Sequence, residues 1–438
     1  MKISVIGLGK LGLCIAACFA SKKHTVLGYD KNKEVISQVS NNLLPVNEPG
    51  LKQLLKKARS NFHIMNSVAD CVLNSNITLI IVPTPSDPKG RFTNKYIEDV
   101  LRKISPILKN KKTFYVIDII STIMPASCDL VFKPLLEKLT GKVCGRDFGL
   151  VYNPAFIALG SAIRDFLNPD LVLIGASDRL SAALIRKLFK TTCNSVPSYA
   201  VMSLVNSEIT KLSINCYITM KISFANELAT ICSKVPGADV DIITNALGAD
   251  SRIGRKSLKG GLGFGGPCFP RDNRAFSAFA KSYGIKTELA KATIKVNISQ
   301  IKNLTNLVLK SIPKTNGSIS VIGLSYKPKT PVIDESPAVK LIYELLKRNM
   351  RVIVYDALAI DNIKACFGDI IHYATSVKNC FVQSSVCIIT TPDNEFKIIN
   401  ENYIVHNPTT IIDCWRIIDP SKLGNKVKYI PFGKLSTY

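Results

Sequence analysis

Short apolar runs alternate with longer stretches of helical periodicity along most of the chain. The first two runs, Lys2–Ile6 and Thr25–Tyr29, have the length of buried strands, and residues 13–22 between them have the pattern of an apolar helix. A strand, a turn, a helix and a second strand within about 30 residues predict a βαβ unit with parallel strands.

The same alternation continues to about residue 195 and then gives way to helical periodicity. Residues 198–235 contain no Gly, so we expect one long helix there, of the kind that connects domains and often supplies a dimer interface. More helix is expected at residues 239–247 and 273–311. Before residue 195, the expected strands are 78–82, 113–118, 149–152 and 171–175, and the expected helices are 96–108 and 128–138.

A second strand–turn–helix–strand unit begins near residue 318. The sequence therefore predicts an α/β fold with two Rossmann-like doubly wound domains, joined by a long central helix and a helical middle domain. We place the N-terminal domain at residues 1–195, the central domain at 196–312 and the C-terminal domain at 313–438. In the last of these, strands are expected at 318–322, 351–355, 386–390 and 410–413, with a helix at 337–348.

Composition and charge narrow the class of protein. The chain has 57 basic and 32 acidic residues, a net charge of +25, and this field attracts anions such as nucleotides. The charge is dispersed, without zinc-finger spacing or a basic–aromatic repeat, so we expect no nucleic-acid partner. The apolar runs are too short to span a bilayer, and the N-terminus lacks the layout of a signal peptide. We therefore expect a cytoplasmic protein with no membrane partner, no bound metal, and reduced cysteines.

The turn after the first strand has the pattern Gly7-x-Gly9-x-x-Gly12, and Asp30 follows about 20 residues later. Such glycines let the backbone approach a pyrophosphate, and the helix N-terminus that follows favours its negative charge. A carboxylate at the position of Asp30 accepts hydrogen bonds from ribose hydroxyls, which favours NAD over NADP. The alternative is a glycine turn with no ligand.

A second glycine-rich segment leads to a single cysteine. Residues 260–266 contain five glycines, and Cys268 follows at the start of an expected helix, close to Arg271. A helix N-terminus and a neighbouring cation favour the thiolate, so Cys268 is a candidate nucleophile. The alternative is a buried structural cysteine, which is how we interpret the other twelve.

Lys211 and Asn215 lie four residues apart on the expected long helix and share one of its faces. A cation and a carboxamide that project together can stabilise an oxyanion. From spacing alone, a solvated helix face is the better interpretation.

Taken together, these motifs resemble the UDP-glucose/GDP-mannose dehydrogenase family over nearly the whole chain. The most specific element is the glycine segment that ends in Cys268 and Asp272. The other markers are the Gly7–Gly12 turn with Asp30, residues 82–85 (Val-Pro-Thr-Pro), Ser121-Thr122, Asn153-Pro154-x-Phe156 with Gly160, Lys211 with Asn215, Arg252-Ile253-Gly254, and Gly323-x-x-Tyr326-Lys327.

The resemblance implies oxidation of a sugar C6 alcohol to a carboxylate, with two hydride transfers to NAD. Cys268 is then expected to hold the aldehyde as a thiohemiacetal and the next intermediate as a thioester. Lys211 and Asn215 are expected to stabilise the oxyanion, and Asp272 to orient or deprotonate water. Thr122 completes the expected catalytic set.

The resemblance also implies ligand contacts and a homodimer built on the long helix, because Arg252 matches a position that reaches into the partner subunit's site. The expected cofactor contacts are Gly7, Gly9, Lys10, Leu11, Gly12, Asp30, Thr84 and Thr122. The expected sugar-nucleotide contacts are Phe156, Ile157, Lys211, Asn215, Arg252, Lys259, Phe264, Gly265, Lys327 and Arg416. For Lys259, Lys327 and Arg416 the alternative is ordinary surface charge.

Two segments depart from the family pattern. In the family, a glutamate usually follows Asn-Pro and is the base for thioester hydrolysis, but here Ala155 occupies that position. Leu159 occupies the position of the next carboxylate residue of the family, four residues later. A methyl group cannot accept a proton, so we expect impaired hydrolysis. Three explanations are open: an engineered trap, a natural variant that uses Asp272 or another base, or a degraded enzyme. In the loop after Lys327, Asp334 stands where the family usually has Arg, and Pro331-Val332 replace acidic residues.

UDP-glucose is the favoured substrate, with GDP-mannose and UDP-N-acetylhexosamines as alternatives. A catalytically inactive nucleotide-sugar-binding homologue is the alternative from another class, and Ala155 is the feature that supports it. The retained Cys268, Lys211, Asn215 and Asp272 argue against it, because a binding protein has no need of a reactive thiol.

Overall fold

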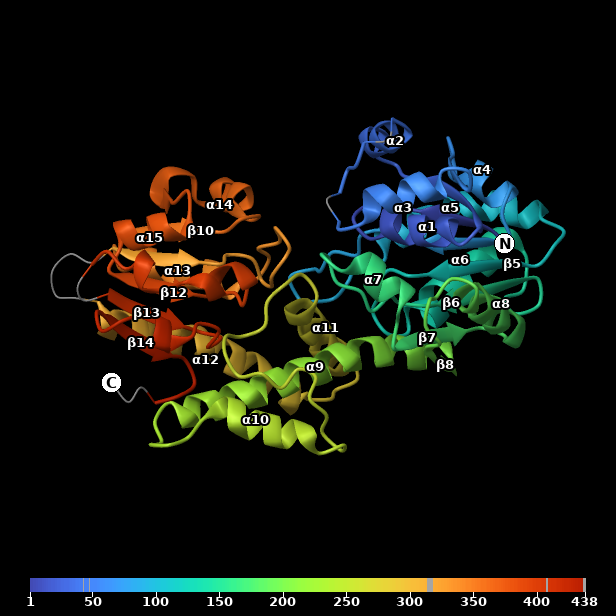
Figure 1. The fold of residues 1–438 in the computed structure, drawn as a ribbon. Helices are drawn as coiled ribbons and strands as arrows, with labels where there is room; N and C mark the ends of the chain where they lie inside the picture. The colour runs from blue at the N-terminus through green and yellow to red at the C-terminus, as the bar shows by residue number, and fades with distance from the viewer. Residues whose placement is uncertain (42, 47, 313–317, 407–408, 436–438) are drawn as a thin grey trace. The chain divides into compact units, whose positions relative to one another are not determined.

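The computed structural model describes residues 1–41, 43–46, 48–312, 318–406 and 409–435 (Figure 1). It divides into two compact units, Met1–Ser213 and Ile214–Tyr438. None of the helices in the described ranges is long and apolar enough to cross a lipid bilayer. The two doubly wound sheets and the helical middle region confirm the predicted fold class.

The first unit is built on an eight-stranded sheet with the order β3-β2-β1-β4-β5-β6-β7-β8. All neighbouring strands are parallel except β6 and β7, which pair antiparallel. The chain reverses its strand order beside β1, and in such sheets ligands bind at the carboxyl ends of the strands on either side of that point. The strands are β1 Lys2–Ile6, β2 Thr25–Tyr29, β3 Phe62–Ile64, β4 Ile77–Ile80, β5 Tyr115–Ile119, β6 Phe148–Tyr152, β7 Leu171–Ala176 and β8 Ser198–Met202.

Helices cover both faces of this sheet, and each face has its own hydrophobic cluster (Figure 1). Alternate residues of a strand point to opposite faces, so in β5 Val116 packs in one cluster and Tyr115 and Ile117 in the other. The helices are α1 Gly12–Ser21, α2 Lys33–Ser40, α3 Leu51–Ala58, α4 Val68–Leu73, α5 Lys95–Asn110, α6 Lys133–Thr140, α7 Ala162–Leu167 and α8 Arg179–Lys190, with a π-helical turn at Cys128–Phe132.

The prediction of one helix over residues 198–235 was wrong at its beginning. Residues Ser198–Met202 form β8, which pairs in parallel with β7 at the edge of the sheet, and the long helix α9 runs from Leu204 to Cys232. Tyr199 and Val201 favour extended structure when a neighbouring strand is available, and this pairing outweighs the local helical pattern. The boundary between the two units falls within α9.

The second unit contains the remaining helical region and a six-stranded parallel sheet with the order β11-β10-β9-β12-β13-β14. The strands are β9 Ile319–Ile322, β10 Val352–Tyr355, β11 His372–Tyr373, β12 Val386–Ile389, β13 Thr409–Asp413 and β14 Val427–Pro431. The helices are α10 Val240–Ala249, α11 Phe269–Ser282, α12 Glu288–Ser311, α13 Pro337–Leu346, α14 Ile360–Phe367 and α15 Val377–Gln383, with short 3-10 turns at Gly368–Ile370, Asn394–Ile398, Glu401–Tyr403 and Pro420–Lys422.

Two details of this unit bear on the predictions. The helical region expected over residues 273–311 is two helices, because the chain turns at Gly284, where φ is +75°. The expected domain boundary at residue 313 lies within residues 313–317, outside the described residues.

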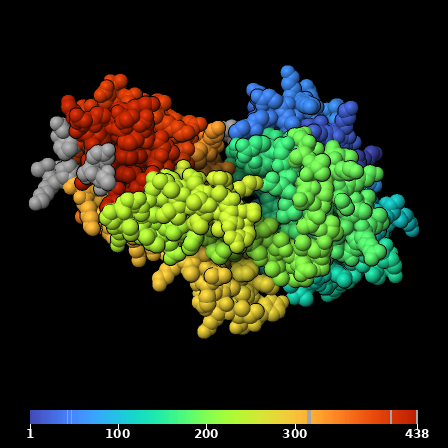
Figure 2. Space-filling view, turned by 60° about the horizontal axis from the view of Figure 1, so that its bottom comes forward, coloured from blue at the N-terminus to red at the C-terminus, as the bar shows by residue number. Residues whose placement is uncertain are grey.

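Helix α10 lies on the surface shown in Figure 2, in yellow-green, and its Ile242 side chain is exposed.

Candidate active site

The glycine turn after β1 leaves room for the pyrophosphate of a bound dinucleotide. Gly7 has φ = +99°, and a Cβ atom there would lie 2.1 Å from the carbonyl oxygen of Ile81, so no other residue fits. A Cβ at Gly9 would meet nothing within 4 Å, so this side of the turn is open. Helix α1 follows without a side-chain cap, and its first N–H groups therefore remain available to a phosphate.

Asp30, at the end of β2, is fixed beside this turn. Its Oδ2 accepts a hydrogen bond from the Leu8 N–H at 2.7 Å, and its Oδ1 accepts one from the Asn32 N–H at 2.8 Å. A carboxylate has further lone pairs with which to accept hydrogen bonds from ribose hydroxyls. The residues present therefore fit a dinucleotide with an unmodified ribose, which is the geometry expected for NAD.

The loops that follow β4 and β5 are tied together at the carboxyl edge of the sheet. The Thr84 hydroxyl donates to the carbonyl oxygen of Thr122 at 2.6 Å. The Ser121 hydroxyl donates to the carbonyl oxygen of Val82 at 2.7 Å and accepts from the Val82 N–H at 2.8 Å. The structure thus brings Thr84 and Thr122 together at the ends of β4 and β5, next to the point between β1 and β4 where the strand order reverses.

Glu208 on α9 holds the continuation of the Thr122 loop and was missed from the sequence. Its carboxylate accepts hydrogen bonds from the N–H groups of Ala126, at 2.5 Å, and Cys128, at 2.9 Å. Burial raises the pKa of Glu208 to about 7, although the hydrogen bonds from Cys128 and Ala126 lower it. The available signal was a lone carboxylate one helical turn before Lys211.

Lys211 is held against the loop that follows β6. Its Nζ donates to the carbonyl oxygen of Ala155 at 2.8 Å and lies 4.2 Å from the centroid of the Phe156 ring. The side chain is buried, so this ammonium group is a strong local charge. The departure at Ala155 is therefore located next to the ammonium group of Lys211.

The far end of the same loop is held by Glu48, which was also missed. The Glu48 carboxylate is buried and accepts hydrogen bonds from the N–H groups of Gly160 and Ala162, each at 2.7 Å. Its 112-residue separation from Gly160 left no local pattern that could reveal the contact.

In the second unit, the exposed Cys268 is the N-cap residue of α11, as the sequence predicted. One turn later, the Asp272 N–H donates to the carbonyl oxygen of Cys268 at 2.8 Å. The Asp272 carboxylate is buried, and its Oδ2 accepts a hydrogen bond from the Asn215 Nδ2 at 2.6 Å. A thiol at a helix N-terminus, with a carboxylate one turn away, is an arrangement suited to nucleophilic catalysis.

Three domain profiles of one family match the chain in order. They are the NAD binding domain over residues 1–193, the central domain over 205–299 and the UDP binding domain over 320–420 of the UDP-glucose/GDP-mannose dehydrogenase family. The chain belongs to this family. It is an NAD-dependent oxidoreductase that acts on a CH–OH group of a nucleotide sugar.

Known relatives extend this similarity over the full length. UDP-glucose 6-dehydrogenase AglM of Haloferax volcanii is 30% identical over 420 residues, which cover 95% of this chain and 97% of that protein. UDP-glucose 6-dehydrogenase TuaD of Bacillus subtilis is 32% identical over 420 residues, covering 94% and 88%. A UDP-glucose dehydrogenase structure from the archaeon Pyrobaculum islandicum has a TM-score of 0.89 at 29% identity, covering 99% and 98%.

The alternative considered for Arg416 was ordinary surface charge, but its side chain is buried. Its side chain is 4% exposed, and its Nε and Nη2 contact the two carboxylate oxygens of Asp241 at 2.7 and 2.8 Å. Nη2 also donates to the carbonyl oxygen of Gly260 at 2.7 Å. The guanidinium group therefore supports the glycine segment from within the unit, and a direct contact with substrate stays a prediction.

The other expected sugar-nucleotide contacts are less constrained. Lys259 is exposed, and Arg252 is exposed and paired with Asp250, with 2.6 Å between its Nη2 and the Asp250 Oδ2. Lys327 Nζ lies 5.8 Å from the centroid of the Tyr326 ring. The remaining members of that set are Ile157, which is half-buried among the helices of the first unit, and Phe264 and Gly265 of the glycine segment.

Proposed function

We propose that this family member oxidises the C6 alcohol of UDP-glucose to the carboxylate through covalent intermediates on Cys268. The observation that carries the proposal is the exposed thiol at the start of α11, one turn from a buried carboxylate that Asn215 holds. The choice of UDP-glucose rests on the relatives AglM and TuaD, both of which are UDP-glucose 6-dehydrogenases.

In the proposed reaction, bound NAD supplies the acceptor for one hydride in each of the two oxidations. After the first oxidation, the Cys268 thiolate adds to the aldehyde carbon, and the carbonyl oxygen becomes the oxygen of a thiohemiacetal. Loss of the second hydride leaves a thioester. Water then attacks the thioester carbon, the C–S bond breaks, and the carboxylate and the thiolate are released.

Lys211 and Asn215 have the chemistry to stabilise negative charge on the substrate oxygen. The Lys211 ammonium group is buried and donates to the carbonyl oxygen of Ala155, and Asn215 donates one of its two amide hydrogens to Asp272. A donor that is fixed before the reaction contributes more than one that must reorient.

Asp272 is the proposed base for the hydrolytic water, in place of the missing carboxylate at Ala155. Its Oδ1 lies 3.5 Å from the Arg271 Nε and accepts no hydrogen bond from any residue that the structure describes. An ionised carboxylate with an open lone pair can accept a proton from water. Because Asp272 also accepts from Asn215, we propose that it replaces the family base at reduced efficiency and that the thioester accumulates.

We further propose that the protein forms a homodimer through α9. The face of this helix that bears Lys221 also bears Tyr217 and Phe224, two large aromatic side chains that are 58% and 51% exposed. A cavity of about 450 Å³ lies beside it and is lined by Leu289 and Arg252, among others. Contiguous exposed apolar surface of this kind is typical of a protein interface.

NADH production measured with the candidate nucleotide sugars tests this function. With NAD and UDP-glucose, we expect a burst of about one to two NADH per chain followed by a slow steady rate. GDP-mannose and UDP-N-acetylhexosamines give no comparable burst if the substrate is UDP-glucose. The absence of NADH with every nucleotide sugar would instead indicate the inactive binding protein.

The Cys268→Ser variant separates the covalent route from simple oxidation. It should make no carboxylate, because a serine hydroxyl is a poor nucleophile without an activating base. Cys366→Ser is the matched control, since Cys366 is also exposed but lies on α14. Normal carboxylate production by Cys268→Ser would refute the thioester route.

A further inference from the structure

Two buried asparagines hold the backbone of the glycine segment that precedes Cys268. Asn226 on α9 accepts a hydrogen bond from the Gly261 N–H at 2.8 Å and donates to the Leu262 carbonyl at 3.2 Å. Asn297 on α12 accepts from the Phe264 N–H at 2.7 Å and donates to the Phe264 carbonyl at 3.0 Å. Each carboxamide thus satisfies one N–H and one carbonyl group of the segment.

This pairing replaces the hydrogen bonds that a strand would obtain from a neighbouring strand. Residues 260–266 form no helix or strand, and their buried backbone groups must find other partners. The side chains of Asn226 and Asn297 are 0% and 9% exposed, so water does not compete strongly for these bonds. A carboxamide, which only Asn and Gln possess, carries its donor and its acceptor on two separate atoms of one planar group.

The close approach of the Asn297 carboxamide explains why residue 263 is a glycine. A Cβ atom at Gly263 would lie 2.2 Å from the Asn297 Oδ1 and 3.0 Å from its Cγ, so any side chain there would displace the carboxamide. The backbone of this segment is hydrogen-bonded to α9 through Asn226 and to α12 through Asn297. Glycine at this position therefore permits close approach to α12.

Gln300 on α12 provides a second set of buried hydrogen bonds that joins this helix to α9 at Asn226. Gln300, which is 2% exposed, donates through its Nε2 to the Asn226 carbonyl at 3.1 Å and to the Thr230 hydroxyl at 3.2 Å. Buried polar networks of this kind fix a single arrangement of the elements that they connect.

We propose that Asn226 and Asn297 are positioning residues that set where the Cys268 thiol and the Phe264 backbone lie. The inference rests on the proposed function, because it assigns the two amides to the capture of an aldehyde by that thiol. The first oxidation needs no thiol, whereas the second follows thiol addition. Loosening the segment should therefore impair capture more than the first hydride transfer, and free aldehyde should escape.

The test measures how the product divides between aldehyde and carboxylate. Wild type and Asn297→Ala are incubated with NAD, UDP-glucose and a hydroxylamine trap. Mass spectrometry quantifies the oxime, which reports free aldehyde, and the hydroxamate that hydroxylamine forms from the thioester is counted with the carboxylate. Because a misplacement of about 1 Å can cost about 100-fold in rate, we expect the ratio of trapped aldehyde to carboxylate to rise at least about tenfold. Asn297→Asp keeps the acceptor and loses the donor, so its ratio should fall between the two, and it decides the question if Asn297→Ala does not fold.

The matched control is Thr305→Ala on the same helix. Thr305 is 2% exposed, and its hydroxyl donates to the Ile301 carbonyl within α12. Its loss should lower stability without changing the product ratio. An unchanged ratio in Asn297→Ala and Asn297→Asp, or an equal rise in Thr305→Ala, would overturn the positioning role. A wild-type protein that makes no NADH would refute the proposed function instead.

Discussion

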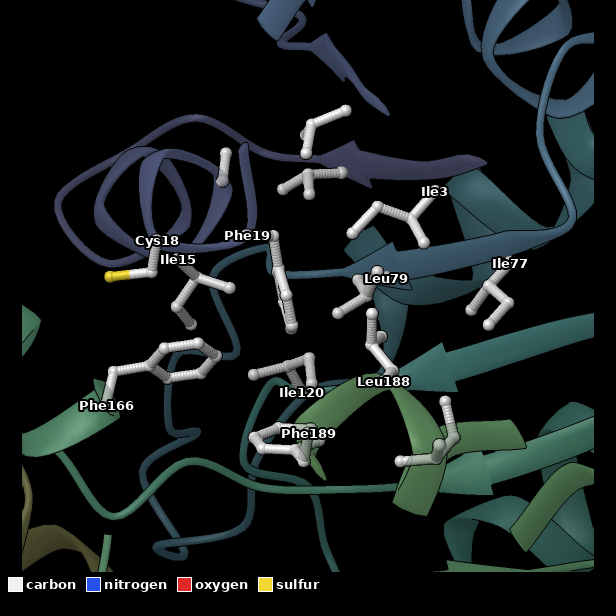
Figure 3. Close-up of a cluster of buried hydrophobic side chains, with 14 of the residues drawn as sticks. Ile3, Ile15, Cys18, Phe19, Ile77, Leu79, Ile120, Phe166, Leu188 and Phe189 are labelled. Carbon is white, nitrogen blue, oxygen red and sulfur yellow. The ribbon is translucent and has the colours of Figure 1, made fainter. Parts of the chain in front are cut away.

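Asp118 in β5 is a carboxylic acid buried without a hydrogen bond, and we predict that it makes the protein less stable as the pH rises. The side chain is fully buried, and neither of its oxygens has a hydrogen-bond partner among the described residues. Its neighbours across the sheet are Leu79 on β4 and Val151 on β6. Figure 3 shows Leu79 and Ile120 within the apolar cluster on this face.

The direction of the effect follows from the pKa. Burial raises the pKa of Asp118 well above its usual value, so the folded state keeps the proton over a pH range in which the unfolded chain has lost it. The stability contributed by the neutral acid is fully present below about pH 4 and is lost as the pH rises towards the folded-state pKa. Each pH unit within that window lowers the free energy of unfolding by about 1.4 kcal/mol.

Asp118→Asn removes this titration while keeping the size of the side chain. As the pH rises from 5 to 8, the free energy of unfolding of the variant should increase relative to that of wild type for as long as the pH stays below the folded-state pKa of Asp118. At about 2–4 °C per kcal/mol, the melting temperature difference should widen by several degrees. Calorimetry at pH 5, 6.5 and 8 measures this, with the exposed Asp99→Asn as the control.

If the difference in melting temperature between Asp118→Asn and wild type is the same at all three pH values, Asp118 does not titrate in this window.

Three other changes have defined outcomes. Ala155→Glu restores a carboxylate beside Lys211, and the steady NADH rate after the burst should rise at least about tenfold; no rise would mean that hydrolysis is not limited there. Asp30→Ala should raise the KM for NAD about tenfold or more and leave that for the nucleotide sugar nearly unchanged, in initial-rate kinetics. Arg416→Met removes both guanidinium contacts of the half-buried Asp241 carboxylate and leaves it, among the described residues, only the Lys434 ammonium at 3.7 Å, and it should cost about 2–4 kcal/mol in chemical denaturation, against no more than about 0.5 kcal/mol for the exposed Lys259→Met.

The sequence was sufficient to predict those features that depend on a few consecutive residues. The glycine turn, Asp30 and the position of Cys268 at the start of α11 were all visible in this way, because turns and helix ends depend on neighbouring residues. β8 was not, because Ser198–Met202 becomes a strand only through its pairing with β7.

The residues that support the site could not be found from the sequence for the same reason. The Glu208 carboxylate accepts hydrogen bonds from residues 80 and 82 positions away, and Asn297 is 33 positions from Phe264. An isolated Glu or Asn on a helix has no pattern that distinguishes it from a solvated one. Their roles depend on which loops the fold brings to them.

The central claim is that Cys268 holds a partly oxidised sugar. Peptide mass spectrometry tests this claim most directly. The protein is mixed with NAD and UDP-glucose, quenched in acid during the slow phase and digested to locate any adduct. We predict that the mass of the sugar nucleotide acyl group appears on the peptide that contains Cys268 and is absent from Cys268→Ser. A wild-type protein that turns over substrate yet carries no adduct at Cys268 at any time point would contradict the account.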